Sequence, residues 1–171
     1  MDSYLKDLNR FCRSVEKKYP TINSGGCGFF AATLGKHLAK HFPVALRVGS
    51  SWIEDAHDMD INDIRPNVSN NTVADWNGYD VIFGHVIVEL IYDGKKYHVD
   101  TSGVHRPAKR DPTFRFPLYQ GEFTIKEMEE LTKEMSPDDW NASFPRKAIR
   151  PIKSMTTSFF KNQASRYHYV Y

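Results

Sequence analysis

The fold is decided by one stretch of the chain, which reads His85-Val86-Ile87-Val88-Glu89-Leu90-Ile91-Tyr92-Asp93-Gly94-Lys95-Lys96-Tyr97-His98-Val99-Asp100-Thr101. Two apolar runs flank the dipeptide Asp93-Gly94, which is typical of two-residue hairpin turns. With this turn the two strands pair residue against residue, outward from Tyr92 and Lys95. The stretch therefore predicts two antiparallel strands, over 81–92 and 95–101.

This register predicts that one face of the hairpin is apolar and the other polar, because side chains alternate between the two faces of a strand. The apolar face consists of Val88, Leu90, Tyr97 and Val99. The polar face consists of His85, Ile87, Glu89, His98 and Asp100. We expect the apolar face to enter the core, so any chemistry of the hairpin belongs to the polar face.

His85 and Asp100 are diagonal neighbours on the polar face, about 7–8 Å apart at the backbone. An aspartate placed there can accept a hydrogen bond from one ring nitrogen while the other nitrogen serves as a general base. His98, which faces Glu89, is a rival base, and a third interpretation treats all these side chains as unrelated surface polars. We favour His85 because it opens its strand after Gly84, near an end that a helix N-terminus can reach.

A candidate nucleophile lies upstream, in Gly25-Gly26-Cys27-Gly28. The glycines predict a tight turn that runs directly into a helix. Unpaired N–H groups and the helix dipole favour a thiolate there, so we expect a lowered pKa for Cys27. The N–H of Gly28 and the side chain of Asn23 are candidate oxyanion donors. Cys12, in contrast, lies in the apolar stripe of a helix and is expected in the core.

The remaining elements are predicted from apolar spacing and from Pro and Gly breakers. We expect helices over 3–18, from 27 to about 41, over 124–135 and after 151, a short helix starting at 136–139, and a strand over 44–52. Loops are expected over 53–80, which is acidic and rich in Asn, and over 105–120, which is rich in Pro. Helices followed by antiparallel strands indicate an α+β fold.

Two segments of the chain resemble the core of the transglutaminase-like cysteine enzymes. The first is Gly26-Cys27-Gly28-Phe29-Phe30-Ala31-Ala32 with Pro43-Val44-Ala45-Leu46-Arg47-Val48, similar to a cysteine-bearing helix that leads through a proline turn into a strand. The second is the hairpin, similar to the histidine strand and "V-D-P-T" strand of that family. Arylamine N-acetyltransferases share the plan, including a fifteen-residue step from His85 to Asp100. Their arginine before Gly-Gly is Ser24 here, which argues against a coenzyme A acetyl donor.

The resemblance covers residues 23–103 and implies a papain/transglutaminase-like fold, in which the helix that carries the nucleophile packs on an antiparallel sheet. It implies an acyl-thioenzyme at Cys27, with His85 as base and then acid and Asp100 orienting His85. The expected activity is acyl transfer on an amide, with hydrolysis or deamidation of a protein or peptide favoured. A transglutaminase or acyltransferase that uses an amine acceptor is the first alternative. The second is a catalytically inactive binding module that acts through the basic, aromatic C-terminal end.

Composition is that of a globular domain, with 40% hydrophobic and 26% charged residues, so we expect one domain over 1–171. No apolar run reaches the length of a membrane span and no signal pattern opens the chain, so we expect a cytoplasmic protein with no membrane partner. No cofactor motif is visible. His37 and His41 have the four-residue spacing of zinc ligands, but the glutamate of such motifs is replaced by Leu38, so no metal is expected.

The C-terminal end is basic. From Trp140 onward the chain has six basic residues and no acidic one, and three of them fall in a helical segment expected over about 151–171. Aromatic residues accompany them. An acidic partner or a nucleic acid is therefore a candidate ligand of this segment, whereas the simpler interpretation is a solvated amphipathic helix.

Overall fold

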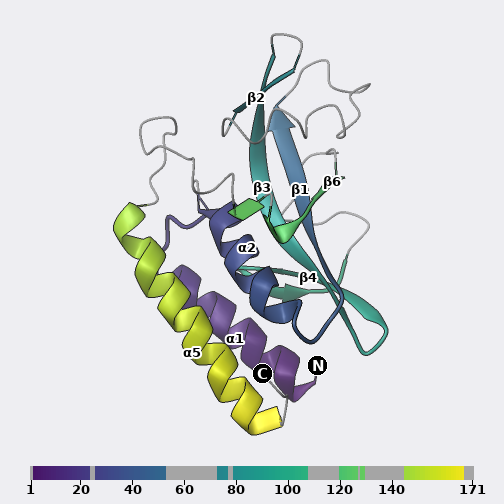
Figure 1. The fold of residues 1–171 in the computed structure, drawn as a ribbon, viewed down its shortest axis with the longest axis vertical. Coiled ribbons are helices and arrows are strands. Elements are labelled where there is room, and N and C mark those ends of the chain that lie inside the picture. Colours follow the sequence, from purple (N-terminus) through teal and green to yellow (C-terminus); the bar gives the residue numbers. More distant parts are fainter. Residues whose placement is uncertain are drawn as a thin grey trace.

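The computed structural model describes residues 2–23, 26–52, 73–76, 79–107, 120–126, 128–129 and 145–167. Its helices gather against one side of a twisted antiparallel sheet (Figure 1). They are α1 (Ser3–Lys18), α2 (Cys27–Leu38) and α5 (Ile149–Tyr167), with a 3-10 turn, η2 (Arg146–Ala148), directly before α5. The strands are β1 (Val44–Trp52), β2 (Val73–Trp76), β3 (Tyr79–Tyr92), β4 (Lys95–Asp100), β5 (Gly103–His105) and β6 (Gln120–Phe123).

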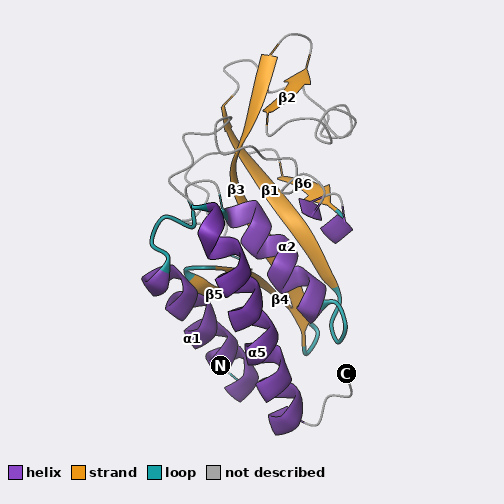
Figure 2. Cartoon of the chain, turned by 60° about the vertical axis from the view of Figure 1, so that its left-hand side comes forward, coloured by secondary structure: helices purple, strands orange, loops and turns teal. Residues whose placement is uncertain are grey.

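The sheet runs in the order β5-β4-β3-β1-β6, with β2 paired to the first part of β3. Every described pairing is antiparallel. Figure 2 shows β2 and the start of β3 extending beyond the helices, which cover the other end of the sheet. The predicted α+β class is thus confirmed.

The β3–β4 hairpin has the predicted register, from Tyr92 opposite Lys95 to Val88 opposite Val99. Its two turn residues have positive φ angles, 50° at Asp93 and 65° at Gly94. This is the combination that a type I′ turn requires, and it matches the twist of the flanking strands. The turn therefore fixes which side chains of both strands face the core.

Two predicted boundaries were wrong. Val73–Trp76 and Tyr79–Asp80, placed in the 53–80 loop, are β-structure, because Trp76 pairs with Tyr79 and Asp75 with Asp80 across a short hairpin. The four residues of β2 show no regular alternation of apolar and polar side chains, so no strand signal is visible there in the sequence. The second helix ends at Leu38 rather than near His41, because the N–H groups of His41 and Phe42 both bond to the Leu38 carbonyl and close a turn.

Other predicted elements fall partly outside the described residues. The helix over 3–18 and the strand over 44–52 have the expected bounds. Residues 125–126 and 128–129 are helical, whereas the rest of the predicted 124–135 helix, the helix start at 136–139, and residues 53–72 and 108–119 lie outside the description. The last helix begins at Ile149, so Pro151 lies in its first turn, where a missing N–H costs nothing.

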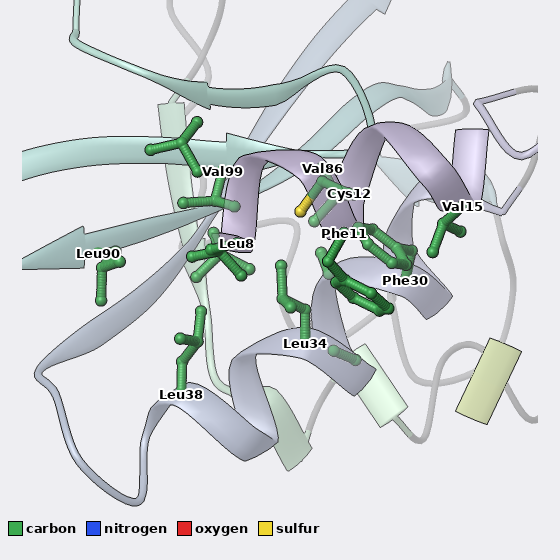
Figure 3. Close-up of a cluster of buried hydrophobic side chains, with 14 of the residues drawn as sticks. Leu8, Phe11, Cys12, Val15, Phe30, Leu34, Leu38, Val86, Leu90 and Val99 are labelled. Atoms are coloured by element: carbon green, nitrogen blue, oxygen red, sulfur yellow. The ribbon is translucent and has the colours of Figure 1, made fainter. Parts of the chain in front are cut away.

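The core lies between the helices and the apolar face of the hairpin. Figure 3 shows side chains from α1 and α2 packed against Val86, Leu90 and Val99. Cys12 is fully buried among them, as predicted. Full burial of each such aliphatic side chain contributes about 1.5–3 kcal/mol. This packing fixes the position of α2, and with it Cys27, relative to β3.

Helix α5 lies alongside α1 and is held at two points. Phe159 stacks on Phe11, with ring centroids 4.4 Å apart. Arg166 and the hydroxyl of Tyr167 both donate to Asp7 Oδ2, at 2.6 and 3.2 Å. Among the described helices, α5 included, none combines the length and the apolar character needed to cross a lipid bilayer.

Candidate active site

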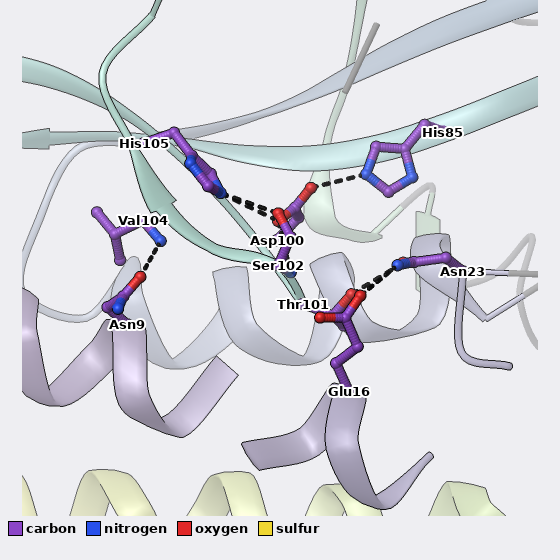
Figure 4. A network of polar contacts seen from close by, with 9 residues as sticks. All are labelled: Asn9, Glu16, Asn23, His85, Asp100, Thr101, Ser102, Val104 and His105. Carbon is purple, nitrogen blue, oxygen red and sulfur yellow. Dashed lines mark hydrogen bonds and ion pairs between the residues drawn. The ribbon is translucent and has the colours of Figure 1, made fainter. Parts of the chain in front are cut away.

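His85 and Asp100 meet on neighbouring strands, as the register predicts. His85 Nε2 lies 2.9 Å from Asp100 Oδ2 (Figure 4). Both residues are buried, at 9% and 4% exposure, so solvent competes little for this contact. Because the carboxylate occupies Nε2, the ring nitrogen left for Cys27 is Nδ1.

Cys27 is the first residue of α2, and its thiol is close enough to His85 for that imidazole to lower the pKa of the thiol. The cap residue, Gly26, provides no side chain to satisfy the first N–H groups of the helix. Burial acts to raise the pKa of Cys27, but the hydrogen bond and charge of His85, with backbone hydrogen bonds from Val86 and Gly28, lower it below the usual 9.0. Cys27 as a residue is partly exposed, in contrast to Cys12, which is buried.

The pKa shifts of Cys27, His85 and Asp100 are linked, because each group stabilises the charged form of its neighbour. Burial acts to lower the pKa of His85, but hydrogen bonds to Asp100 and Cys27 raise it to about 10. Burial acts to raise the pKa of Asp100, but hydrogen bonds from His85 and Ser102 hold it below the usual 3.8. The lowered pKa of the thiol and the raised pKa of the imidazole, about 10, both favour a thiolate–imidazolium pair over the neutral pair.

The site occupies the place where the β3–β4 pairing ends. The described register with β3 stops at Val88 and Val99, whereas on its other edge β4 stays paired with β5 as far as Asp100, which lies opposite Gly103. Val86 pairs with Val48 of β1 but has no described partner on β4, and its backbone helps to lower the pKa of Cys27. The role of Val86 was not predicted from the sequence, although its position next to His85, beyond the end of a hairpin ladder, is a usable signal.

The two predicted oxyanion donors have different surroundings. Gly28 contributes a backbone hydrogen bond to the Cys27 sulfur, so its N–H points toward the site. Asn23 Nδ2 donates to Glu16 Oε1 at 3.2 Å, and Asn23 Oδ1 accepts from Thr101 Oγ1 at 2.9 Å. Asn23 thus ties the segment before Cys27 to the residue after Asp100, and its role as an oxyanion donor stays a prediction.

The rival base, His98, belongs to another group of side chains. Its Nε2 lies 3.6 Å from Glu89 Oε2, and Glu89 Oε1 lies 3.0 Å from both Arg47 and Lys96. Burial acts to raise the pKa of Glu89, but Arg47 and Lys96 together lower it. Glu89 and Ile87 are 8% and 2% exposed, so the polar face is not the open surface that one interpretation assumed.

Within the described part of the chain, no group of three or more His, Cys, Asp and Glu side chains is arranged to hold a metal ion. A buried carboxylate, an imidazole and a thiolate at a helix N-terminus form instead the arrangement used in nucleophilic catalysis. Comparisons of the chain with protein-family models, with curated proteins and with solved structures find no match.

Proposed function

We propose that this protein is a cysteine enzyme that transfers the acyl group of an amide through a thioester on Cys27. The observation that carries the proposal is the single imidazole of His85, which lies 2.9 Å from the buried Asp100 carboxylate and also lowers the pKa of the Cys27 thiol. A nucleophile, its base and an orienting acid in contact are the recognised requirements for covalent catalysis.

In the first half of the reaction, the Cys27 thiolate attacks the amide carbon and the carbonyl electrons move to oxygen. The N–H groups of Gly28 and Val86, which lie at the sulfur, are suited to stabilise this oxyanion. Collapse breaks the C–N bond, His85 gives its Nδ1 proton to the leaving amine, and a thioester remains. Asp100 keeps the imidazole in the orientation and tautomer that this transfer needs.

In the second half, water attacks the thioester carbonyl and gives a proton to His85. The C–S bond breaks, which releases a carboxylic acid and restores the thiolate–imidazolium pair. We favour water as the acceptor and a protein or peptide amide as the substrate, so that the reaction is hydrolysis or deamidation. An amine in place of water gives a transglutaminase or acyltransferase, the first alternative.

The proposed fold is papain/transglutaminase-like. Two features support it: a helix that opens at the nucleophilic cysteine packs on an antiparallel sheet, and the next strand of the chain, β1, pairs with the histidine strand β3. The His85 strand is in turn paired with the Asp100 strand through the hairpin. This is the order that the sequence resemblance implies.

The first experiment measures alkylation of the native protein by iodoacetamide at mildly acidic pH, with mass spectrometry to locate the label. Cys27 is expected to react quickly, because its thiolate persists there, whereas Cys12 is buried and its pKa is raised by burial. Cys12 is thus an internal control. If Cys27 reacts no faster than Cys12, the enzyme proposal is wrong.

The second experiment separates hydrolysis from transfer. Candidate proteins are incubated with the wild-type enzyme and with Cys27→Ser, with and without a small primary amine, and their peptides are analysed by mass spectrometry. Cleaved bonds or amides converted to acids indicate water as the acceptor, whereas incorporated amine indicates transfer. All of these products are expected to be absent with Cys27→Ser.

One observation favours the second alternative, a binding module for nucleic acid. Exposed basic side chains line α1 at helical spacing and recur on α5 beside it. They are Lys6, Arg10, Arg13 and Lys17 on α1 and Arg150, Lys153, Lys161 and Arg166 on α5. Binding of duplex DNA that weakens steeply with salt, and is lost when Arg13 and Lys17 are neutralised, favours this module. Absence of binding at low salt excludes it.

A further inference from the structure

Two residues outside the triad contact the oxygen of Asp100 that His85 does not use. Asp100 Oδ1 accepts from the backbone N–H of Ser102 at 2.8 Å and from its hydroxyl at 2.5 Å. The Ser102 hydroxyl lies 2.9 Å from His105 Nε2, which is itself 3.8 Å from Asp100 Oδ1. Figure 4 shows Asp100 between the two imidazoles, with His85 on one side and His105 on the other.

The direction of each hydrogen bond in this chain follows from the chemistry of its members. An ionised carboxylate only accepts hydrogen bonds, and a hydroxyl has a single proton to donate. Because Ser102 gives its proton to Asp100, its oxygen must accept from His105, and His105 must carry a proton on Nε2. The donors therefore point in one direction, from His105 to Ser102 and from Ser102 to Asp100.

Ser102 lies in the turn from β4 into β5, residues 101–104, which we call the corner. The corner is hydrogen-bonded to two other parts of the chain. Thr101 Oγ1 donates to Asn23 Oδ1 at 2.9 Å, which links the corner to the segment before α2. The N–H of Val104 donates to Asn9 Oδ1 of α1 at 2.9 Å. Gly103, between them, has a φ of 131°, a conformation that other residues rarely adopt. These two hydrogen bonds hold the corner in place, and Ser102 and His105 therefore keep fixed positions.

We propose that Ser102 and His105 are positioning residues of the reaction: Ser102 binds Oδ1, His105 binds the Ser102 hydroxyl, and together they hold the Asp100 carboxylate in the rotamer that presents Oδ2 to His85. This inference rests on the proposed function, since it assigns the two residues to the same triad. Without the two side chains Oδ1 keeps only the backbone N–H of Ser102, so the carboxylate is held less firmly about its Cβ–Cγ bond and the imidazolium of His85 loses part of its stabilisation. The Cys27 thiolate then forms only at higher pH.

The test measures the rate of iodoacetamide alkylation of Cys27 against pH for wild type, Ser102→Ala and His105→Leu. Loss of the hydroxyl hydrogen bond in Ser102→Ala is expected to reduce the rate at pH 6 on the order of fivefold and to move the profile upward in pH. His105→Leu, which removes a partner one step further away, is expected to reduce the rate about twofold. Ser102→Thr and His105→Gln retain a hydroxyl and an N–H donor, and are expected to recover most of the loss.

The matched control is His98→Gln, which changes a histidine of the neighbouring strand whose imidazole lies near Glu89 instead. Its profile is expected to match the wild type. Thermal unfolding of each variant shows that it is folded, and His105, with a side chain 42% exposed, is the safer of the two positions to change.

The outcomes separate the two proposals. If wild-type Cys27 shows no reactivity below the usual thiol range, the proposed function fails and the positioning role fails with it. If the wild type is reactive but Ser102→Ala and His105→Leu share its profile, only the positioning role is overturned. A shift in Ser102→Ala without one in His105→Leu overturns the role of His105.

Discussion

Replacement of Asp100 by Asn tests the triad more directly than any other single change. Asp100 accepts hydrogen bonds on both oxygens, from His85 on Oδ2 and from Ser102 on Oδ1. An amide has only one oxygen. The Ser102 hydroxyl can rotate to accommodate an NH₂ group, but the Ser102 backbone N–H cannot, so the amide oxygen is expected to face Ser102.

The NH₂ group of the new amide then faces His85 Nε2, which has to become an acceptor. The ring proton moves to Nδ1, the nitrogen that faces Cys27, and the imidazole can no longer take a proton from the thiol. If the amide instead turns its oxygen to His85, its NH₂ group meets the N–H of Ser102, donor against donor. Either orientation loses a hydrogen bond to a charged group.

The magnitude follows from the strength of the hydrogen bond that the substitution removes. A hydrogen bond to a charged group contributes about 1.5–3 kcal/mol, and each 1.4 kcal/mol corresponds to about tenfold. Alkylation of Cys27 at pH 6 is therefore expected to slow about 10- to 100-fold, with the pH profile moving toward that of an ordinary thiol. Amide turnover is expected to fall further, since the same change in serine protease triads costs about 10⁴-fold by the same tautomer effect.

The assay is the pH profile of iodoacetamide alkylation between pH 5 and 9, with nitrogen NMR of His85 to identify the protonated ring nitrogen. Glu89→Gln is the matched control, because Glu89 is a buried carboxylate on β3 that binds Arg47 and Lys96 rather than the triad. It is expected to keep the wild-type profile. An Asp100→Asn protein that is folded and retains fast alkylation at pH 6 refutes the reasoning.

Two further predictions concern the corner after Asp100 and the proton on His85. Gly103→Ala places a Cβ 2.2 Å from Asn9 Oδ1 at a φ of 131°, and is expected to lower stability by about 2–4 kcal/mol and the melting temperature by roughly 6–12 °C. Gly94→Ala, with φ 65° and open space around it, is expected to lower stability by only about 1 kcal/mol. Because the raised pKa of His85, about 10, keeps the ring protonated until that pH, amide turnover is expected to fall above it as the leaving amine loses its proton donor. Alkylation, which needs only the thiolate, is expected to continue there, and equal loss of both rates contradicts this assignment.

The central part of the fold was predictable because its signals are local. Asp93-Gly94 adopts the positive φ angles that a two-residue turn needs, so the register of β3 and β4 followed from the turn alone. The contact of His85 with Asp100 followed in turn from that register. The glycines before Cys27 likewise indicated where α2 begins.

The remaining features depend on contacts between distant parts of the chain. The short strands β2 and β5 exist because a longer strand is there to pair with, and neither has an apolar pattern of its own. Asn23, interpreted as an oxyanion donor or a turn residue, is bonded to Glu16 and Thr101, and no local rule gives either partner. The roles of Ser102 and His105 were not predicted. Their positions around Asp100 depend on the geometry of the corner, which could not be derived from the sequence.

The geometry of that corner also explains how one fold brings three distant residues together. If β4 continued along β3 past Asp100, its backbone would pair with Val86, and the N–H that now binds the Cys27 sulfur would be consumed. The chain instead turns at Thr101 and Ser102 and pairs Asp100 with Gly103. The β4 side of β3 is left unpaired where the first turn of α2 arrives, and Asp100, the residue directly after the last β3–β4 pair, supplies the carboxylate. Stability of the corner and ionisation of the thiol are therefore expected to change together in variants of Gly103, because both depend on where the pairing of β4 stops.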